Sequence, residues 1–172
     1  MIIKKANQIR LSLIALLSVF LLTTGCKQES IEDYPLLGGD SINFEDLHGK
    51  AVLLVYWADW CVTCRGAIEE INNFASGHKE NVVTLGVNMD HLQGEKLAKQ
   101  AEMLGIKFPL LLDDPRSRFG VEPSEVLPEI LVIDREGRFQ QLLMGPQSVE
   151  ALEMVILKME GDMDYPNGEQ GT

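Results

Sequence analysis

Cysteine and histidine are scarce in this chain, whose 172 residues include only three of each. Three cysteines cannot supply a four-thiolate zinc site, and His48, His78 and His91 lack the spacing of metal ligands. The sequence also has no internal repeat, which excludes solenoid architectures. We therefore expect one ordinary domain with no metal and no other cofactor.

Basic residues are outnumbered by acidic ones, 15 against 26, and the formal net charge is −11. The first 25 residues contain Lys4, Lys5 and Arg10 but no acidic residue, so their removal would leave 12 basic against 26 acidic residues, or −14. A surface of this charge repels phosphate backbones, and nucleic acid is therefore not expected as a partner. Solubility alone is a sufficient explanation for the charge.

The N-terminal segment has the order of a secretory signal, with basic residues, an apolar run over residues 11–22 and small residues before Cys26. The run is shorter than the roughly 20 residues of a membrane span. Gly25 directly before Cys26 resembles a bacterial lipoprotein site, which implies cleavage there and lipid on Cys26. A plain cleaved signal and an uncleaved anchor remain open. All three place the domain outside the cytoplasm, on the periplasmic side of the cell envelope.

Composition divides the chain into four expected parts. They are a signal peptide over 1–25, a polar tether over 26–40, a folded domain over 41–160 and a flexible acidic tail over 161–172.

Hydrophobic patterning within the domain predicts an α/β fold. Unbroken apolar runs predict buried strands at 51–57 and 82–88, after a short strand and turn at 41–50. Helical periodicity predicts helices at 64–75, 95–104 and 148–159. Two further strands, 129–134 and 138–144, are joined by the tight turn Arg135-Glu136-Gly137. This order favours parallel strands first and an antiparallel hairpin at the end.

Cys61 and Cys64 lie two residues apart where the first buried strand meets the first helix. A helix N-terminus favours a thiolate, which indicates that Cys61 is a nucleophile and Cys64 the resolving thiol of a redox pair. A static disulfide is a weaker explanation, because closing so short a loop adds little stability. Half of a metal site is also weaker, because no second cysteine pair exists.

The segment Val-Tyr-Trp-Ala-Asp-Trp-Cys-Val-Thr-Cys-Arg at 55–65 resembles the active site of thioredoxins. It is most similar to the TlpA-like group of membrane-tethered, extracytoplasmic thioredoxins, which includes cytochrome c maturation proteins. The resemblance covers about residues 41–160, including an extra segment at 89–114 and Pro128. It implies a thioredoxin-like fold with a central mixed sheet flanked by helices and a central insertion.

By this resemblance Pro128 is a cis-proline packed against the cysteine pair, and the backbone of Leu127 is free to bind a client chain as an added strand. The alternative is an ordinary proline at a strand entry. Trp60 is expected beside the site and partly exposed, with Trp57 in the core.

Two positions depart from the family pattern. Val55 replaces the buried acid of thioredoxins, and Ala67 replaces a glutamate that many cytochrome c maturation members carry. The usual proton acceptor for Cys64 is therefore missing. Either Glu129 or Asp59 could substitute, or water could carry the proton. The inserted residues 122–125 are expected to alter the substrate groove.

The resemblance implies an extracytoplasmic thiol:disulfide oxidoreductase that reduces client proteins or relays electrons from a membrane reductant conductor. A thiol oxidase or isomerase is an alternative, although no histidine lies between the cysteines. A Cu(I) metallochaperone is a second alternative, although no methionine or histidine lies close to the pair in sequence.

Overall fold

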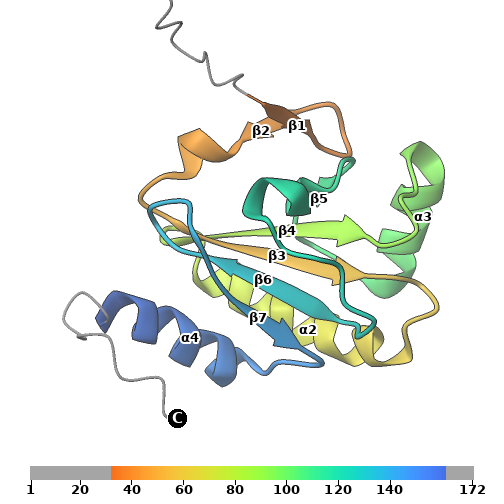
Figure 1. Cartoon of the computed structure of the whole chain (residues 1–172). Helices are drawn as coiled ribbons and strands as arrows, with labels where there is room; N and C mark the ends of the chain where they lie inside the picture. The colour runs from red at the N-terminus through yellow and green to blue at the C-terminus, as the bar shows by residue number, and fades with distance from the viewer. Residues whose placement is uncertain (1–31, 162–172) are drawn as a thin grey trace, which may run out of the picture. The chain divides into compact units, whose positions relative to one another are not determined.

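The computed structural model describes residues 32–161 of the chain, and the elements follow one another as drawn in Figure 1. The predicted signal peptide, Cys26 and residues 162–172 of the predicted tail lie outside the described residues. No helix in the described part is both long enough and apolar enough to cross a membrane.

The strands of the described domain form a mixed five-stranded sheet in the order β5-β4-β3-β6-β7. The parallel strands are β3 (Ala51–Trp57), β4 (Val82–Asn88) and the short β5 (Leu110–Leu111), while β6 (Glu129–Ile133) and β7 (Phe139–Met144) are antiparallel. All seven residues of β3 are buried, because this central strand is covered on both faces. The predicted parallel strands and terminal hairpin are confirmed.

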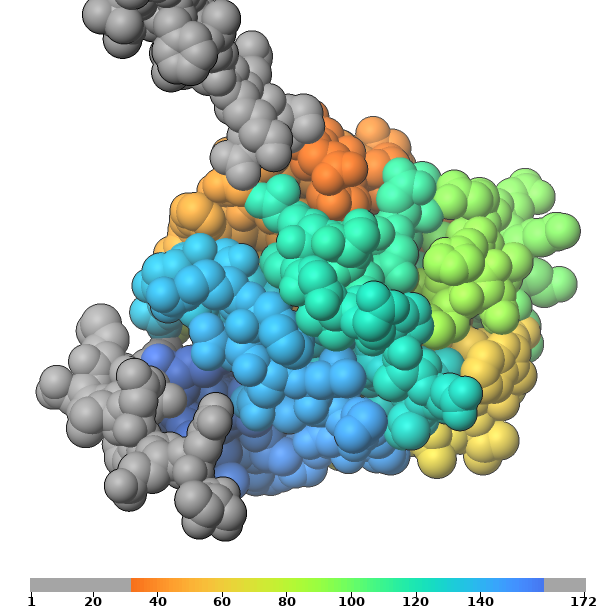
Figure 2. All heavy atoms as spheres, in the orientation of Figure 1, coloured from red at the N-terminus to blue at the C-terminus, as the bar shows by residue number. Residues whose placement is uncertain are grey.

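Successive side chains of β3 point to opposite faces of the sheet and so enter two separate cores. Val55 and Trp57 pack with Cys61 and Cys64 in one core, which we call the cysteine face. Tyr56 packs in the other core, which we call the opposite face. In Figure 2 the segments between β5 and β6, coloured turquoise, lie across the centre of the visible surface and hide much of the sheet.

Three helices contribute to the cysteine face: α2 (Val62–Gly77), α3 (Gly94–Leu104) and α4 (Val149–Gly161). The start of α2 lies two residues before the predicted start, because Cys61 serves as its N-cap. The end of α3 agrees with its prediction, since Gly105 takes the left-handed conformation (φ 70°) that glycine tolerates.

The domain begins earlier than expected. We expected residues 26–40 to form a tether, but β1 (Asp33–Pro35) pairs with β2 (Ser41–Asn43), ahead of the 3-10 helix η1 (Phe44–Leu47). The physical reason is the burial of Tyr34, whose ring meets that of Phe44 edge to face with centroids 5.1 Å apart. A second 3-10 helix that the patterning did not indicate, η2, spans Pro115–Phe119.

Candidate active site

The strand-to-helix junction places the two cysteines at the N-terminus of α2. Cys61 and Cys64 form a disulfide, with the Cα atoms 5.3 Å apart. The Cys64 backbone N–H also donates to Cys61 Sγ at 3.1 Å, which makes the sulfur itself the helix cap. Cys61 is 5% exposed and Cys64 is fully buried. The first sulfur is thus the outer one, and it receives the N-terminal field of the helix.

The segment before β6 reaches the disulfide from the other side. The Leu127–Pro128 peptide is cis, as the resemblance implied. Thr63, between the cysteines, donates its hydroxyl to the Leu127 carbonyl at 2.9 Å, and its oxygen lies 3.4 Å from Cys61 Sγ. The structure therefore brings Leu127 and Pro128 together with the cysteines, and Thr63 connects the two segments.

Exposed apolar side chains lie next in sequence to Cys61 and to Leu127. Trp60 is 63% exposed, and its indole N–H donates to both carboxylate oxygens of Asp90, at 3.1 and 3.2 Å. Val62 and Val126 are also exposed, and they adjoin Cys61 and Leu127 in the chain. Trp57 is fully buried, so both expectations for the tryptophans are confirmed.

Asp59 lies two residues before Cys61 and is half-buried. Its carboxylate accepts a hydrogen bond from the side-chain amide of Gln100, on α3, at 2.7 Å. Its carbonyl oxygen accepts from the Arg65 guanidinium at 3.0 Å. The carboxylate is thus bound to α3, one of the three helices that contribute to the cysteine face.

Glu129 lies on the other side of the sheet from the cysteines. It is opposite Tyr56 in the β3–β6 pairing, and paired residues of antiparallel strands share a face. The side chain is 1% exposed, and its Oε1 forms an ion pair with Arg116 Nη1 at 2.5 Å. The structure therefore does not bring Glu129 together with Cys64, because the period-two alternation of β6 directs it to the opposite face.

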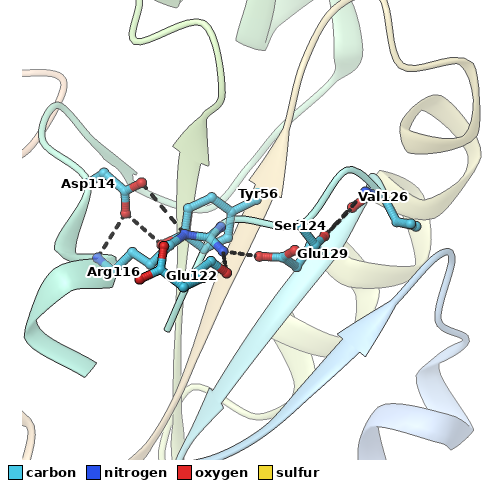
Figure 3. Close-up of polar contacts among 7 residues, drawn as sticks. All are labelled: Tyr56, Asp114, Arg116, Glu122, Ser124, Val126 and Glu129. Carbon is cyan, nitrogen blue, oxygen red and sulfur yellow. Dashed lines mark hydrogen bonds and ion pairs between the residues drawn. The ribbon is translucent and has the colours of Figure 1, made fainter. Parts of the chain in front are cut away.

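Arg116 occupies the centre of a polar cluster that sequence reasoning missed (Figure 3). Its Nη1 donates to the Glu122 carbonyl at 3.0 Å, and its guanidinium carbon lies 3.9 Å from the centre of the Tyr56 ring. The Tyr56 hydroxyl donates to Asp114 at 2.7 Å. Burial, and then this hydrogen bond, raise the pKa of Tyr56 well above its usual value. Spacing alone could not identify the cluster, because its members come from three separate segments.

Thr63 is a second residue that the sequence analysis did not select. Its position between the cysteines was visible, but its contact with Leu127 joins residues 64 positions apart. No group of three or more potential metal ligands occurs among residues 32–161.

Comparisons with known proteins agree on the fold. A family model described as "AhpC/TSA family" matches residues 23–141. "Thiol-disulfide oxidoreductase ResA" of Bacillus thuringiensis (strain Al Hakam) is 29% identical over 124 residues, covering 72% of this chain and 71% of that protein.

Two solved structures extend the comparison. The structure of MTB dsbF in mixed oxidised and reduced forms is 25% identical, with a TM-score of 0.60, and covers 75% of this chain and 95% of that chain. The pneumococcal exposed lipoprotein thioredoxin Etrx1 from Streptococcus pneumoniae strain TIGR4 is 24% identical, with a TM-score of 0.57 over 74% of this chain and 99% of that chain. The expected thioredoxin-like fold is confirmed.

Proposed function

The chain belongs to the AhpC/TSA family, and we propose that it reduces disulfide bonds of client proteins in the bacterial cell envelope. Its enzyme class is thiol:disulfide oxidoreductase. The observation that carries the proposal is the Cys61–Cys64 disulfide at the N-terminus of α2, joined through Thr63 to the cis Leu127–Pro128 segment.

In the proposed cycle the Cys61 thiolate attacks one sulfur of a client disulfide, and the other client sulfur leaves as a thiolate that takes up a proton. Cys64 then loses its proton and attacks Cys61 Sγ. This step re-forms the Cys61–Cys64 bond and releases the second client thiolate. The client gains two electrons and the enzyme loses two. A membrane reductant conductor then restores the dithiol.

Client binding is assigned to the backbone of Leu127 beside Pro128, where an extended client segment can add as a strand. Trp60 offers an aromatic surface next to Cys61, and its large exposed area supports this role. The proton of Cys64 is assigned to Asp59 rather than Glu129. Asp59 is half-buried on the cysteine face, whereas Glu129 is occupied by Arg116 on the opposite face.

The place of action follows from the N-terminal sequence. We assign residues 1–25 to a signal peptide and Cys26 to lipid attachment, with the residues between Cys26 and β1 as the tether to the membrane. The TlpA-like resemblance makes apocytochrome c a candidate client. Labelling of cells with a radioactive fatty acid tests the anchor: the label should enter the wild-type chain and not the Cys26→Ser variant.

Two measurements test the activity. In a chelated, metal-free sample the wild type should reduce insulin disulfides and Cys61→Ser should not. In cells, Cys64→Ser should accumulate disulfide-linked clients, because the mixed disulfide can no longer be resolved. Stoichiometric copper binding without insulin reduction would favour a metallochaperone instead. Faster oxidation of a reduced, unfolded protein than reduction of insulin would favour an oxidase.

A further inference from the structure

The hydroxyl of Thr63 lies within reach of two acceptors that belong to different halves of the candidate site. It donates to the Leu127 carbonyl at 2.9 Å, and the same oxygen lies 3.4 Å from Cys61 Sγ. A threonine hydroxyl has a single proton and can donate to one of them at a time. The two contacts are therefore alternatives for the same donor.

The better acceptor changes with the oxidation state of the cysteines. In the disulfide form Cys61 Sγ is neutral and a weak acceptor, so the carbonyl retains the hydroxyl proton. After reduction the helix N-terminus favours a Cys61 thiolate, and hydrogen bonds to an ionised acceptor are roughly twice as strong as neutral ones. Rotation of the hydroxyl proton about the C–O bond toward sulfur is then favoured.

We propose that Thr63 is a positioning residue that couples the redox state of Cys61 to the hydrogen-bonding capacity of the Leu127 carbonyl. In the reduced enzyme the hydroxyl stabilises the Cys61 thiolate and leaves the Leu127 carbonyl open to a backbone N–H of the client. In the oxidised enzyme the hydroxyl returns to the carbonyl and competes with that N–H. The reduced form thereby binds an extended client segment more tightly than the oxidised product does.

This inference rests on the proposed function, because the coupling matters only if the Cys61–Cys64 pair exchanges with clients. Moving the hydroxyl from the neutral carbonyl to the thiolate gains the difference between a charged and a neutral hydrogen bond, which is a factor of roughly two- to tenfold in an equilibrium constant. We therefore expect the Thr63→Val substitution, which keeps the side-chain shape, to raise the midpoint pH of Cys61 alkylation by iodoacetamide by a few tenths of a unit to about one unit. Thr63→Ser should keep a midpoint near that of the wild type.

The direct readout is the carbonyl ¹³C resonance of Leu127, which moves upfield when a hydrogen bond to the oxygen is lost. In the wild type and in Thr63→Ser it should move upfield on reduction. In Thr63→Val it should hold the upfield position in both oxidation states. Ser124→Ala is a matched control, since the Ser124 hydroxyl donates to the Val126 carbonyl in the same segment and not to Leu127 or to the cysteines. This variant should respond to reduction as the wild type does.

Identical Leu127 resonances in oxidised and reduced wild type, together with an unchanged alkylation midpoint in Thr63→Val, would overturn the coupling even if insulin is reduced at a normal rate. Failure of the wild type to reduce insulin would instead remove the proposed function, whatever the resonances do. The two results are independent, because the spectra and the alkylation profile need no client.

Discussion

The two faces of the central sheet differ in the polar groups that are buried on them. On the cysteine face, the disulfide packs among aliphatic and aromatic side chains of the sheet and its helices. On the opposite face, Arg116 and Glu129 form a buried ion pair, and Tyr56 and Asp114 complete a polar cluster around it. Position 55 belongs to the cysteine face, and it holds valine where thioredoxins have their buried acid.

The difference teaches that the buried ion pair lies on the other side of the sheet from the cysteines, although one of its members, Glu129, directly follows Pro128 in the sequence. Among the described residues, the charged side chains classed as buried are those of Arg116, Glu129 and Asp134. Asp134 follows the far end of β6 and is bound there by Arg138. Thiol exchange therefore has to rely on the α2 N-terminus and nearby partly exposed groups, and not on a buried carboxylate.

The largest expected effect is on the opposite face. Arg116→Met should leave Glu129 as an unpaired buried carboxylate and lower the free energy of unfolding by about 3–5 kcal/mol. Urea denaturation measures this loss. Arg118→Met is the control, because Arg118 pairs with exposed Glu45 and should change stability by less than about 1 kcal/mol. Similar losses in the two variants would mean that the buried pair has no special energetic weight.

A carboxylate can also be restored to the cysteine face. Val55→Asp should speed the Cys64-dependent resolution of the mixed disulfide by about two orders of magnitude, the lower end of what a positioned general base provides. The attack of Cys61 on a small disulfide should stay within a few-fold. Stopped-flow kinetics separate the two steps. Stability should fall by about 1–3 kcal/mol, because a carboxyl group enters an apolar core. An unchanged resolution rate in a folded variant would contradict the view that the cysteine face lacks a buried proton acceptor for Cys64.

The two carboxylates considered for proton transfer can be compared directly. Asp59→Asn should slow resolution roughly tenfold near neutral pH and alter its pH profile, since it removes the assigned acceptor. Glu129→Gln should lower stability but keep the pH profile of the parent. The measurement is the resolution rate from pH 5 to 9. A displaced profile in Glu129→Gln with a normal one in Asp59→Asn would reverse the assignment.

The smallest expected effect concerns Tyr56. Tyr56→Phe removes the hydrogen bond to Asp114 and should cost about 0.5–1.5 kcal/mol at pH 7. Because burial and that hydrogen bond raise the pKa of Tyr56 in the folded state, the unfolded chain ionises first, near pH 10. The stability from Tyr56 is therefore complete below pH 10 and is lost above it. Urea melts from pH 7 to 11 should show a shallower alkaline decline in Tyr56→Phe, and equal declines would contradict this account.

Much of the fold could be predicted from the sequence because local patterns determine it. The unbroken apolar run of β3 and the glycine that ends α3 identified their elements almost to the residue. In contrast, β1 is short and ends at Pro35, and it depends on Tyr34 packing against Phe44. Contacts of that kind leave no local periodicity to detect.

Some residues of the candidate site could likewise be predicted from the sequence, and others could not. The cysteine pair follows from a motif with fixed spacing, whereas the cis bond at Pro128 was implied only by the resemblance to thioredoxins. The role of Glu129 does not follow from a motif, because its partner Arg116 lies 13 positions away and the face on which it lies depends on strand register. Thr63 was visible in the motif, but its partner Leu127 could be identified only once the chain was folded.

The central claim is that Cys61 attacks client disulfides and Cys64 resolves the product. Its most direct test is peptide mapping by mass spectrometry after reduced Cys64→Ser protein reacts with insulin. We predict an insulin chain disulfide-linked to Cys61, and no such adduct in the Cys61→Ser/Cys64→Ser double variant, which still contains Cys26. Absence of an adduct at Cys61, or equal adduct formation in the double variant, would contradict the account.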